Sequence, residues 1–305
     1  MSRIDLEKAH PIPAPLALWI EPTNVCNFKC VFCPESLPDF SARAGYHQHM
    51  KADLWLKIES QLRAIRPKVI RFFHEGEPFL NRALFHMMRQ ARESCDRIEV
   101  TTNGSLLRRD AGRVIQSGCT LVRVSVYGMG PEFQVITGQH GHFTAEDILG
   151  NVAILKTVRG TKELPKIVCK LMVPNASDSI LDAFHYLYAP FADELEYLDK
   201  LHNWGGSLVQ IGSVPVRKVC PMPFYTMAIK ANGAVSVCCA DWDNRLQVGD
   251  ANTEDLLDIW RGDKFAEIRT AHWCGQRALI PSCRDCTAFY DYPDSLDGHL
   301  TPRTE

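Results

Sequence analysis

The chain has 305 residues, a formal net charge of −2 and 46% hydrophobic residues. This balance indicates no basic surface for nucleic acid, and no apolar run is long enough to cross a membrane. Because the charged N-terminus lacks the apolar centre of a signal peptide, we expect a cytoplasmic protein. There the 12 cysteines would stay reduced, so clustered cysteines predict metal sites rather than disulfides.

Three closely spaced cysteines follow the first predicted strand, the apolar run at residues 15–20. Cys26, Cys30 and Cys33 have a C-x₃-C-x₂-C spacing, from which their thiolates can converge on one metal centre. No fourth cysteine is nearby. A zinc site that borrows one of two nearby histidines is one interpretation, but the spacing favours an iron–sulfur cluster with three protein ligands and one open iron.

Apolar periodicity then alternates between strand and helix patterns along the chain. Strands are predicted at residues 69–73, 97–102, 121–126, 166–173 and 195–198, and helices at 50–65, 84–91, 109–117, 145–158 and 179–188. After a lead-in at residues 1–14, residues 15–205 are therefore predicted to form an α/β fold, a TIM-like partial (β/α)₆ barrel. In such folds the functional groups gather at the C-terminal ends of the strands.

The pattern changes after about residue 205. Residues 226–238 predict a β-hairpin with an Asn-Gly turn, and a short helix is predicted to begin at Thr253 as its N-cap. Six cysteines lie in this part of the chain: Cys220, Cys238, Cys239, Cys274, Cys283 and Cys286. We therefore predict a small auxiliary metal-binding domain at residues 206–290, followed by a polar tail at 291–305.

Together these motifs resemble the radical S-adenosylmethionine (SAM) superfamily over about residues 15–290. The cysteine loop follows the first strand, and Gly76-Glu77-Pro78 follows the second. The resemblance implies that the three loop cysteines hold a [4Fe–4S] cluster whose open iron binds SAM. It further implies a 5′-deoxyadenosyl radical that abstracts hydrogen from the substrate, and an external one-electron reductant of the flavodoxin or ferredoxin type.

The same resemblance implies a set of SAM-binding residues. The usual family form has two glycines before Glu-Pro, whereas this chain has Glu75 in the first position, either beside SAM or the substrate or turned to solvent. The expected SAM contacts are Phe32, Gly76, Glu77, Pro78, Asn103, Ser125 and Val173. Core packing is the alternative for the two apolar side chains, and an ordinary turn role is the alternative for the asparagine and the serine.

The C-terminal cysteines resemble a twitch domain, a shortened SPASM domain that carries an auxiliary cluster. The resemblance implies that four of them, Cys220, Cys238, Cys283 and Cys286, hold one further [4Fe–4S] cluster. A second auxiliary cluster would need cysteines after Cys286, and none follow. From the spacing alone, a Cys₄ zinc ribbon remains open. Cys274 is either a ligand in place of Cys283 or a free thiol.

Twitch enzymes that resemble this chain act on sugars and aminocyclitols in antibiotic biosynthesis. Their branches include 2-deoxy-scyllo-inosamine dehydrogenase and neomycin epimerase. We therefore expect hydrogen abstraction from a carbinol carbon of a small polar substrate. Epimerisation is favoured, with Cys239 as hydrogen donor, because a residue that follows Cys238 in a strand points to the opposite face. A buried structural thiol is the alternative role for Cys239.

Other outcomes remain open. In oxidation to a ketone, the substrate radical would lose an electron to the auxiliary cluster and a proton to a base, for which the candidates are Glu75, Tyr127, His74 and Arg71. A ribosomal-peptide maturase is less expected, because the segment before the first strand is short. A non-catalytic metal protein would not explain the Gly-Glu-Pro loop. Side chains expected near a polyol or amino sugar are Glu35, His74, Trp204, Asp241 and Trp242.

Overall fold

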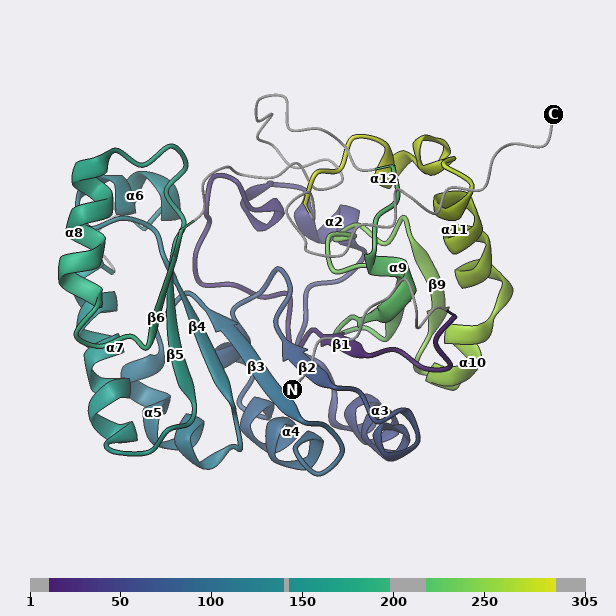
Figure 1. Ribbon diagram of the computed structural model, residues 1–305, viewed down its shortest axis with the longest axis horizontal. Helices are drawn as coiled ribbons and strands as arrows, with labels where there is room; N and C mark the ends of the chain where they lie inside the picture. Colours follow the sequence, from purple (N-terminus) through teal and green to yellow (C-terminus); the bar gives the residue numbers. More distant parts are fainter. Residues whose placement is uncertain (1–10, 140–142, 198–217, 289–305) are drawn as a thin grey trace.

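The structure is a computed structural model that describes residues 11–139, 143–197 and 218–288. A curved sheet of nine strands forms its centre, in the order β6-β5-β4-β3-β2-β1-β7-β8-β9. The strands are β1 (Ala17–Ile20), β2 (Val69–Phe72), β3 (Arg97–Thr102), β4 (Leu121–Val126), β5 (Lys166–Leu171), β6 (Glu194–Tyr197), β7 (Thr226–Ile229), β8 (Ala234–Ser236) and β9 (Gln247–Asp250). Helices cover the outer side of the first six strands (Figure 1).

The helices alternate with the strands as far as β6. They are α2 (Phe40–Ala44), α3 (Ala52–Ile65), α4 (Leu84–Ala91), α5 (Leu107–Gln116), α6 (Pro131–Thr137), α7 (Ala145–Arg159), α8 (Asp178–Tyr188), α9 (Met222–Tyr225), α10 (Leu256–Arg261), α11 (Asp263–Trp273) and α12 (Pro281–Arg284). Three 3₁₀ helices accompany them: η1 (Pro34–Ser36), η2 (Pro78–Leu80) and η3 (Arg277–Leu279). Strands β1 to β6 are all parallel to their neighbours. The predicted α/β fold with a partial barrel is therefore confirmed.

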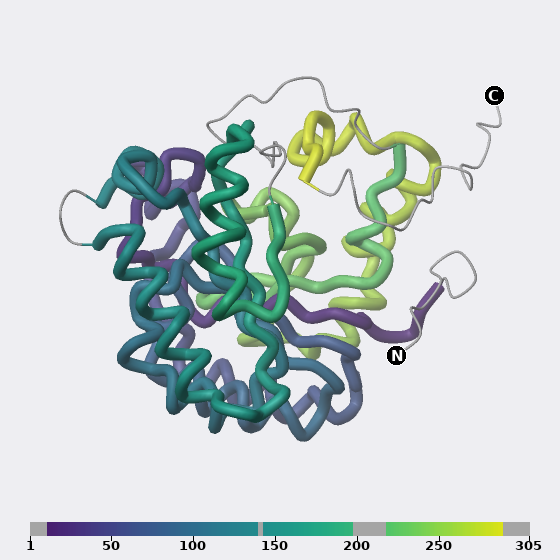
Figure 2. Tube along the Cα trace, turned by 60° about the vertical axis from the view of Figure 1, so that its left-hand side comes forward, coloured from purple at the N-terminus to yellow at the C-terminus, as the bar shows by residue number. Residues whose placement is uncertain are grey.

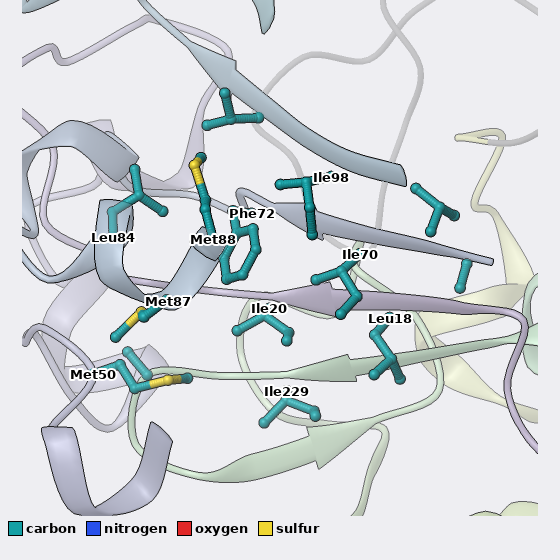
Figure 3. Packing of buried hydrophobic residues seen from close by; sticks show 14 of the residues in the cluster. Leu18, Ile20, Met50, Ile70, Phe72, Leu84, Met87, Met88, Ile98 and Ile229 are labelled. Atoms are coloured by element: carbon teal, nitrogen blue, oxygen red, sulfur yellow. The ribbon is translucent and has the colours of Figure 1, made fainter. Parts of the chain in front are cut away.

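The innermost strands form the core because both of their faces are buried. All four residues of β1 are buried, as is usual for a parallel strand with layers on both sides. Figure 3 shows Leu18, Ile20, Ile70 and Ile229 side by side on neighbouring strands, with Met88 of α4 over them. No helix in the described part of the chain combines the length and apolarity that a bilayer crossing needs.

The C-terminal strands continue the same sheet. Strand β7 lies parallel to β1, with Ala17 opposite Thr226, and β8 pairs with β7 as the predicted antiparallel hairpin. Gly233 closes the turn at φ +97°, where a Cβ atom would lie 1.9 Å from Asn252 Nδ2. Strand β9, which the sequence did not predict, adds a third antiparallel strand. The open edge of β1 is thus covered by a segment about 200 residues away in the chain.

Two local expectations in this region are wrong. Thr253 is not an N-cap, because its amide and that of Glu254 donate to Asp250 O in a turn, and α10 begins three residues later with Asp255 as N-cap. Strand β8 ends at Ser236, after an irregularity in its pairing with β9. Cys238 and Cys239 therefore lie in a turn and not in a strand.

The two parts of the chain also meet through α2. Phe40 of α2 stacks on Trp242 at a centroid distance of 5.8 Å, and Asn244 Nδ2 donates to Ala44 O at 2.7 Å. Figures 1 and 2 both show the C-terminal segment beside the first strand of the sheet. The cysteine loop and the C-terminal region are consequently held on the same side of the molecule.

Candidate active site

The three loop cysteines open onto one cavity at the C-terminal ends of the strands. Its volume is about 240 Å³. The loops after β1, β2, β3, β4 and β5 all contribute to its walls. The lining residues are Cys26, Phe28, Cys30, Phe32, Cys33, Pro34, Phe73, His74, Glu75, Gly76, Glu77, Thr101, Thr102, Asn103, Ser125, Tyr127 and Met172.

The cysteine loop is positioned by a helix that the sequence did not predict. Helix α6 accepts hydrogen bonds from the loop, from Lys29 N to Thr137 O at 3.0 Å and from Val31 N to Ile136 O at 2.9 Å. Phe28 packs edge-on against Phe133 of the same helix, with ring centroids 6.0 Å apart. The only signal for this helix was Pro131, a residue favoured at the first position of a helix.

The chemistry of the three thiols fits a shared metal centre. Burial raises the pKa of Cys26 and of Cys30 to about 12, and that of Cys33 further, with a smaller contribution from neighbouring charges. Thiolates in this position are stable only beside a positive centre. No fourth cysteine lines the described walls of the cavity. Three convergent sulfur ligands therefore suit a cluster that keeps one iron open.

The two histidines of the zinc alternative are engaged elsewhere. His47 Nε2 pairs with Glu35 Oε1 at 3.3 Å, and His49 Nδ1 contacts Thr23 Oγ1 at 2.8 Å. Neither of them lines the cavity. Glu35, expected near the substrate, is buried in a pair with Lys29 at 2.7 Å instead. Neither histidine of the zinc alternative is therefore placed as a fourth ligand beside the three cysteines.

Glu77 braces the loops that form the cavity. Its side chain is buried, and its Oε1 accepts from Thr102 Oγ1 at 2.7 Å and from Phe79 N at 3.1 Å. Its Oε2 accepts from Asn103 N at 2.8 Å. Burial raises the pKa of Glu77 to about 7, although these hydrogen bonds lower it. The carboxylate therefore joins the loops after β2 and β3.

Gly76 permits a close backbone approach that no other residue would allow. A Cβ atom at this position would lie 2.2 Å from Thr23 O and 2.9 Å from Asn24 C, both of which are backbone atoms. We expect Gly76→Ala to displace the loop, destabilise the chain by about 1–3 kcal/mol and weaken SAM binding at least about tenfold, a loss of about 1.4 kcal/mol. Chemical unfolding and equilibrium dialysis with labelled SAM measure the two effects.

Gly112 of α5 is the matched control, because a Cβ atom there meets nothing within 4 Å. Gly112→Ala is expected to stabilise the helix by up to about 1 kcal/mol and to leave SAM binding unchanged. Equal behaviour of the two variants would contradict the close-approach role of Gly76.

Only some of the remaining expected SAM contacts line the larger cavity. Phe32, Asn103 and Ser125 line the cavity together with Gly76 and Glu77. Pro78 and Val173 are buried but do not line it. Because β5 ends at Leu171, Met172 faces the cavity where Val173 was expected. Further lining residues that sequence reasoning missed are Phe28, Phe73, Thr101 and Thr102.

Likewise, only some of the candidate bases and expected substrate residues line the larger cavity. Glu75, His74 and Tyr127 line the cavity, and the Tyr127 hydroxyl bonds with Cys30 and Ser125. Arg71 lies off the cavity and pairs with Glu99 at 2.8 Å. Trp242 is covered by the α2 contact described above, and Trp204 lies outside the described residues.

A second, smaller cavity collects the C-terminal cysteines. Its walls include Cys220, Cys238, Cys283 and Cys286, and exclude Cys274 and Cys239. Asp241, His272 and Arg277 line it as well. Burial, with a smaller contribution from the nearby Cys238 and Cys286 thiols, raises the pKa of Cys220 to about 12. Of the two alternatives for the fourth ligand, this geometry favours Cys283 over Cys274.

Cys239 does not point away from Cys238, contrary to our expectation. Both residues lie in the turn after β8, and their thiols are in hydrogen-bond contact, which is the main cause that raises the pKa of Cys238. Cys239 is half-buried and lines neither the larger nor the smaller cavity.

Comparison with known families agrees with this geometry. Residues 20–173, about half of the chain, match the radical SAM superfamily, and residues 220–287 match SPASM, an iron–sulfur cluster-binding domain. The chain therefore belongs to the radical SAM superfamily and carries a SPASM domain. Its cofactors are accordingly a [4Fe–4S] cluster with SAM, and further iron–sulfur binding in the C-terminal part.

Solved structures show the same fold. BtrN in complex with AdoMet and 2-DOIA has a TM-score of 0.62 at 17% identity, with 98% of both chains covered. Streptococcus suis SuiB bound to precursor peptide SuiA has a TM-score of 0.59 at 16% identity, covering 87% of this chain and 69% of that one.

Curated relatives match a shorter part of the chain. GTP 3′,8-cyclase of Photorhabdus laumondii is 26% identical over 60% of this chain and 54% of its own length. That of Cronobacter sakazakii is 34% identical over 40% of this chain and 37% of its own length. The chain thus matches about half or less of the length of these relatives.

Proposed function

We propose that this radical SAM enzyme abstracts a hydrogen atom from a carbinol carbon of a small polar substrate, such as a sugar or an aminocyclitol. The observation that supports the proposal most is the shared cavity, where three cysteines lie with the polar side chains of Glu75, Ser125 and Tyr127. The bound cluster and SAM supply the 5′-deoxyadenosyl radical for this chemistry. The 17% identical fold relative BtrN was solved with 2-DOIA, which is consistent with a small-molecule substrate.

The chain's own residues have distinct roles in this proposal. Cys26, Cys30 and Cys33 hold the first cluster, and the cysteines of the smaller cavity hold one auxiliary [4Fe–4S] cluster. Because those four thiolates saturate that cluster, it has no open iron for the substrate. The aromatic and aliphatic cavity walls exclude water from the reacting carbon. Glu75 is the side chain placed to receive a hydroxyl proton from the substrate.

The fate of the substrate radical is proposed from the position of Cys239. Epimerisation would need its thiol on the cavity wall, and it lies off both described cavities. Glu75, in contrast, lines the larger cavity. The geometry therefore favours oxidation to a ketone, in which the substrate radical would pass an electron to the auxiliary cluster and a proton to Glu75. Epimerisation is the second candidate, because Cys239 is half-buried and outside the expected ligand set.

Cys239→Ala separates these outcomes. We expect the variant to cleave SAM and to turn over substrate within about twofold of the wild type, a difference below about 0.4 kcal/mol. Cys274→Ala is the matched control, as another half-buried thiol off both cavities. Continued SAM cleavage with complete loss of product in Cys239→Ala alone would favour the epimerase.

An assay of SAM cleavage tests the proposed function as a whole. Anaerobic reconstitution is followed by reduction, and 5′-deoxyadenosine is measured across a panel of aminocyclitols and aminoglycosides. We expect about eight iron atoms per chain, four for each cluster, and cleavage that a member of the panel stimulates. Zinc in place of iron, or no cleavage, would overturn the enzyme function. If only a peptide stimulated cleavage, the substrate would be a peptide and not a small polar molecule.

A further inference from the structure

A second group of ligand-type side chains lies where β1, β2 and β7 end. Glu21 follows β1, while His74 and Glu75 follow β2. One ligand atom from each of these three residues lies within 4.8 Å of the other two. His74 and Glu75 also line the larger cavity, but neither belongs to the expected iron–sulfur ligands.

Three atoms of this group lack hydrogen-bond partners although their side chains are buried. The His74 side chain is 1% exposed and that of Glu21 is 0% exposed. His74 Nδ1 contacts Glu75 Oε2 and lies 3.4 Å from Glu21 Oε1. Within the described residues, neither ring nitrogen of His74 nor Glu21 Oε1 has a hydrogen-bond partner, and of the two nitrogens it is Nδ1 that faces the carboxylates. Buried polar side-chain atoms usually have a hydrogen-bond partner, so these atoms point to a ligand from outside the chain.

The other oxygen of Glu21 is firmly held. Its Oε2 accepts from the Tyr46 hydroxyl at 2.5 Å and from Ala231 N at 2.9 Å. These two contacts come from the loop after the cysteines and from the hairpin turn, so the carboxylate is fixed from both sides. Its unpartnered oxygen consequently has a defined position next to His74, as a metal ligand requires.

Negative charge exceeds positive charge around the group. Lys230 is a nearby cation, and the charges of Glu21 and Asp241 both act on it. Glu75 adds a third carboxylate, and Lys230 Nζ is already bonded to Asp241 O.

We propose that Glu21, His74 and Glu75 bind one divalent cation of the Mn²⁺ or Zn²⁺ type at the wall of the larger cavity. One imidazole nitrogen and two carboxylate oxygens are a ligand set that suits these ions. Lys230 stays outside the set, because an ammonium group offers no lone pair. The proposal goes beyond the proposed function, since hydrogen abstraction does not require this ion. With the ion bound, Glu75 would be a ligand and not the proton acceptor, and the ion would orient a substrate hydroxyl at the cavity wall.

Manganese binding to the reconstituted protein tests the site without substrate or SAM. The clusters are kept oxidised, MnCl₂ is added, and free Mn²⁺ is followed by its EPR signal after dialysis. We expect one Mn²⁺ per chain, displaced by Zn²⁺. Glu75→Gln and His74→Gln should each weaken binding at least about tenfold, as losses in a metal's coordination shells do. Iron and sulfide content shows that each variant still folds and carries its clusters.

The matched controls are Glu93→Gln and His86→Gln, which change exposed residues of the same types. Both should bind Mn²⁺ as the wild type does. No binding up to about 1 mM, equivalent to about −4 kcal/mol, or equal binding by all variants would overturn the proposal. Because no turnover is measured, the absence of Mn²⁺ binding would not contradict the proposed function. Conversely, a chain that binds Mn²⁺ but does not cleave SAM would contradict the proposed function and not the metal site.

Discussion

Cys30→Ala is expected to reduce the iron content of the reconstituted chain from about eight to about four atoms and to abolish SAM cleavage. The cavity offers three thiols, and its described walls contain no further cysteine that could replace a lost ligand. Cys30 is buried, and its thiol is in hydrogen-bond contact with Tyr127, so the change removes a ligand from the centre of the site. Iron and sulfide assays with EPR of the reduced protein measure the effect.

The auxiliary cysteines provide the complementary experiment. Cys283→Ala should also lower iron to about four atoms per chain, but reductive SAM cleavage should persist, because the first cluster is intact. Cys274→Ala should keep about eight atoms, since Cys274 lies off the smaller cavity. The ligand assignment would be wrong if Cys274→Ala lost iron while Cys283→Ala kept it.

Local sequence patterns were sufficient for the parallel half of the fold. Apolar, β-branched runs such as residues 121–126 form buried strands, and the loops after them meet at one edge of the sheet. The cysteine spacing and the position of Gly76 pointed to residues that the structure places on the walls of one cavity. Each of these positions depends on a few neighbouring residues and on the general geometry of parallel sheets.

Features that depend on distant contacts could not be predicted. The pairing of β7 with β1 joins segments about 200 residues apart, and Glu21 gave no sign that it would be fully buried. Cys239 was misplaced because alternation along a strand was extended past Ser236, where β8 ends. Local periodicity carries no information about where a strand loses its partner.

The structure gives the Glu77 side chain a further role, as a brace between loops, at a residue that also lines the cavity. Glu77→Ala is expected to destabilise the chain by about 3 kcal/mol or more. Three donors, from Phe79, Thr102 and Asn103, would lose their acceptor, and each buried unpaired donor costs about 1–3 kcal/mol. Urea unfolding of the metal-free chain measures the change, with the exposed Glu93→Ala as control.

The pH dependence of stability gives a second, independent measure of the same carboxylate. Burial raises the pKa of Glu77 to about 7, whereas an unfolded glutamate titrates at about 4.3. Between these values the folded chain keeps a proton that the unfolded chain has released. This contribution to stability is therefore complete below about pH 4.3 and is lost as pH rises to about 7.

Glu77→Gln cannot titrate, so the variant should lack this fall in stability between about pH 4.3 and pH 7. The difference in unfolding free energy between wild type and variant, measured at several pH values in this window, isolates the contribution of Glu77 from that of other groups. Glu93→Gln should reproduce the wild-type slope, because its carboxylate is exposed. If Glu77→Gln kept the wild-type slope, the Glu77 carboxylate of the wild-type protein would have to be ionised in the folded chain throughout this pH window. In that case the hydrogen bonds from Thr102 and Asn103 would outweigh the cost of burial.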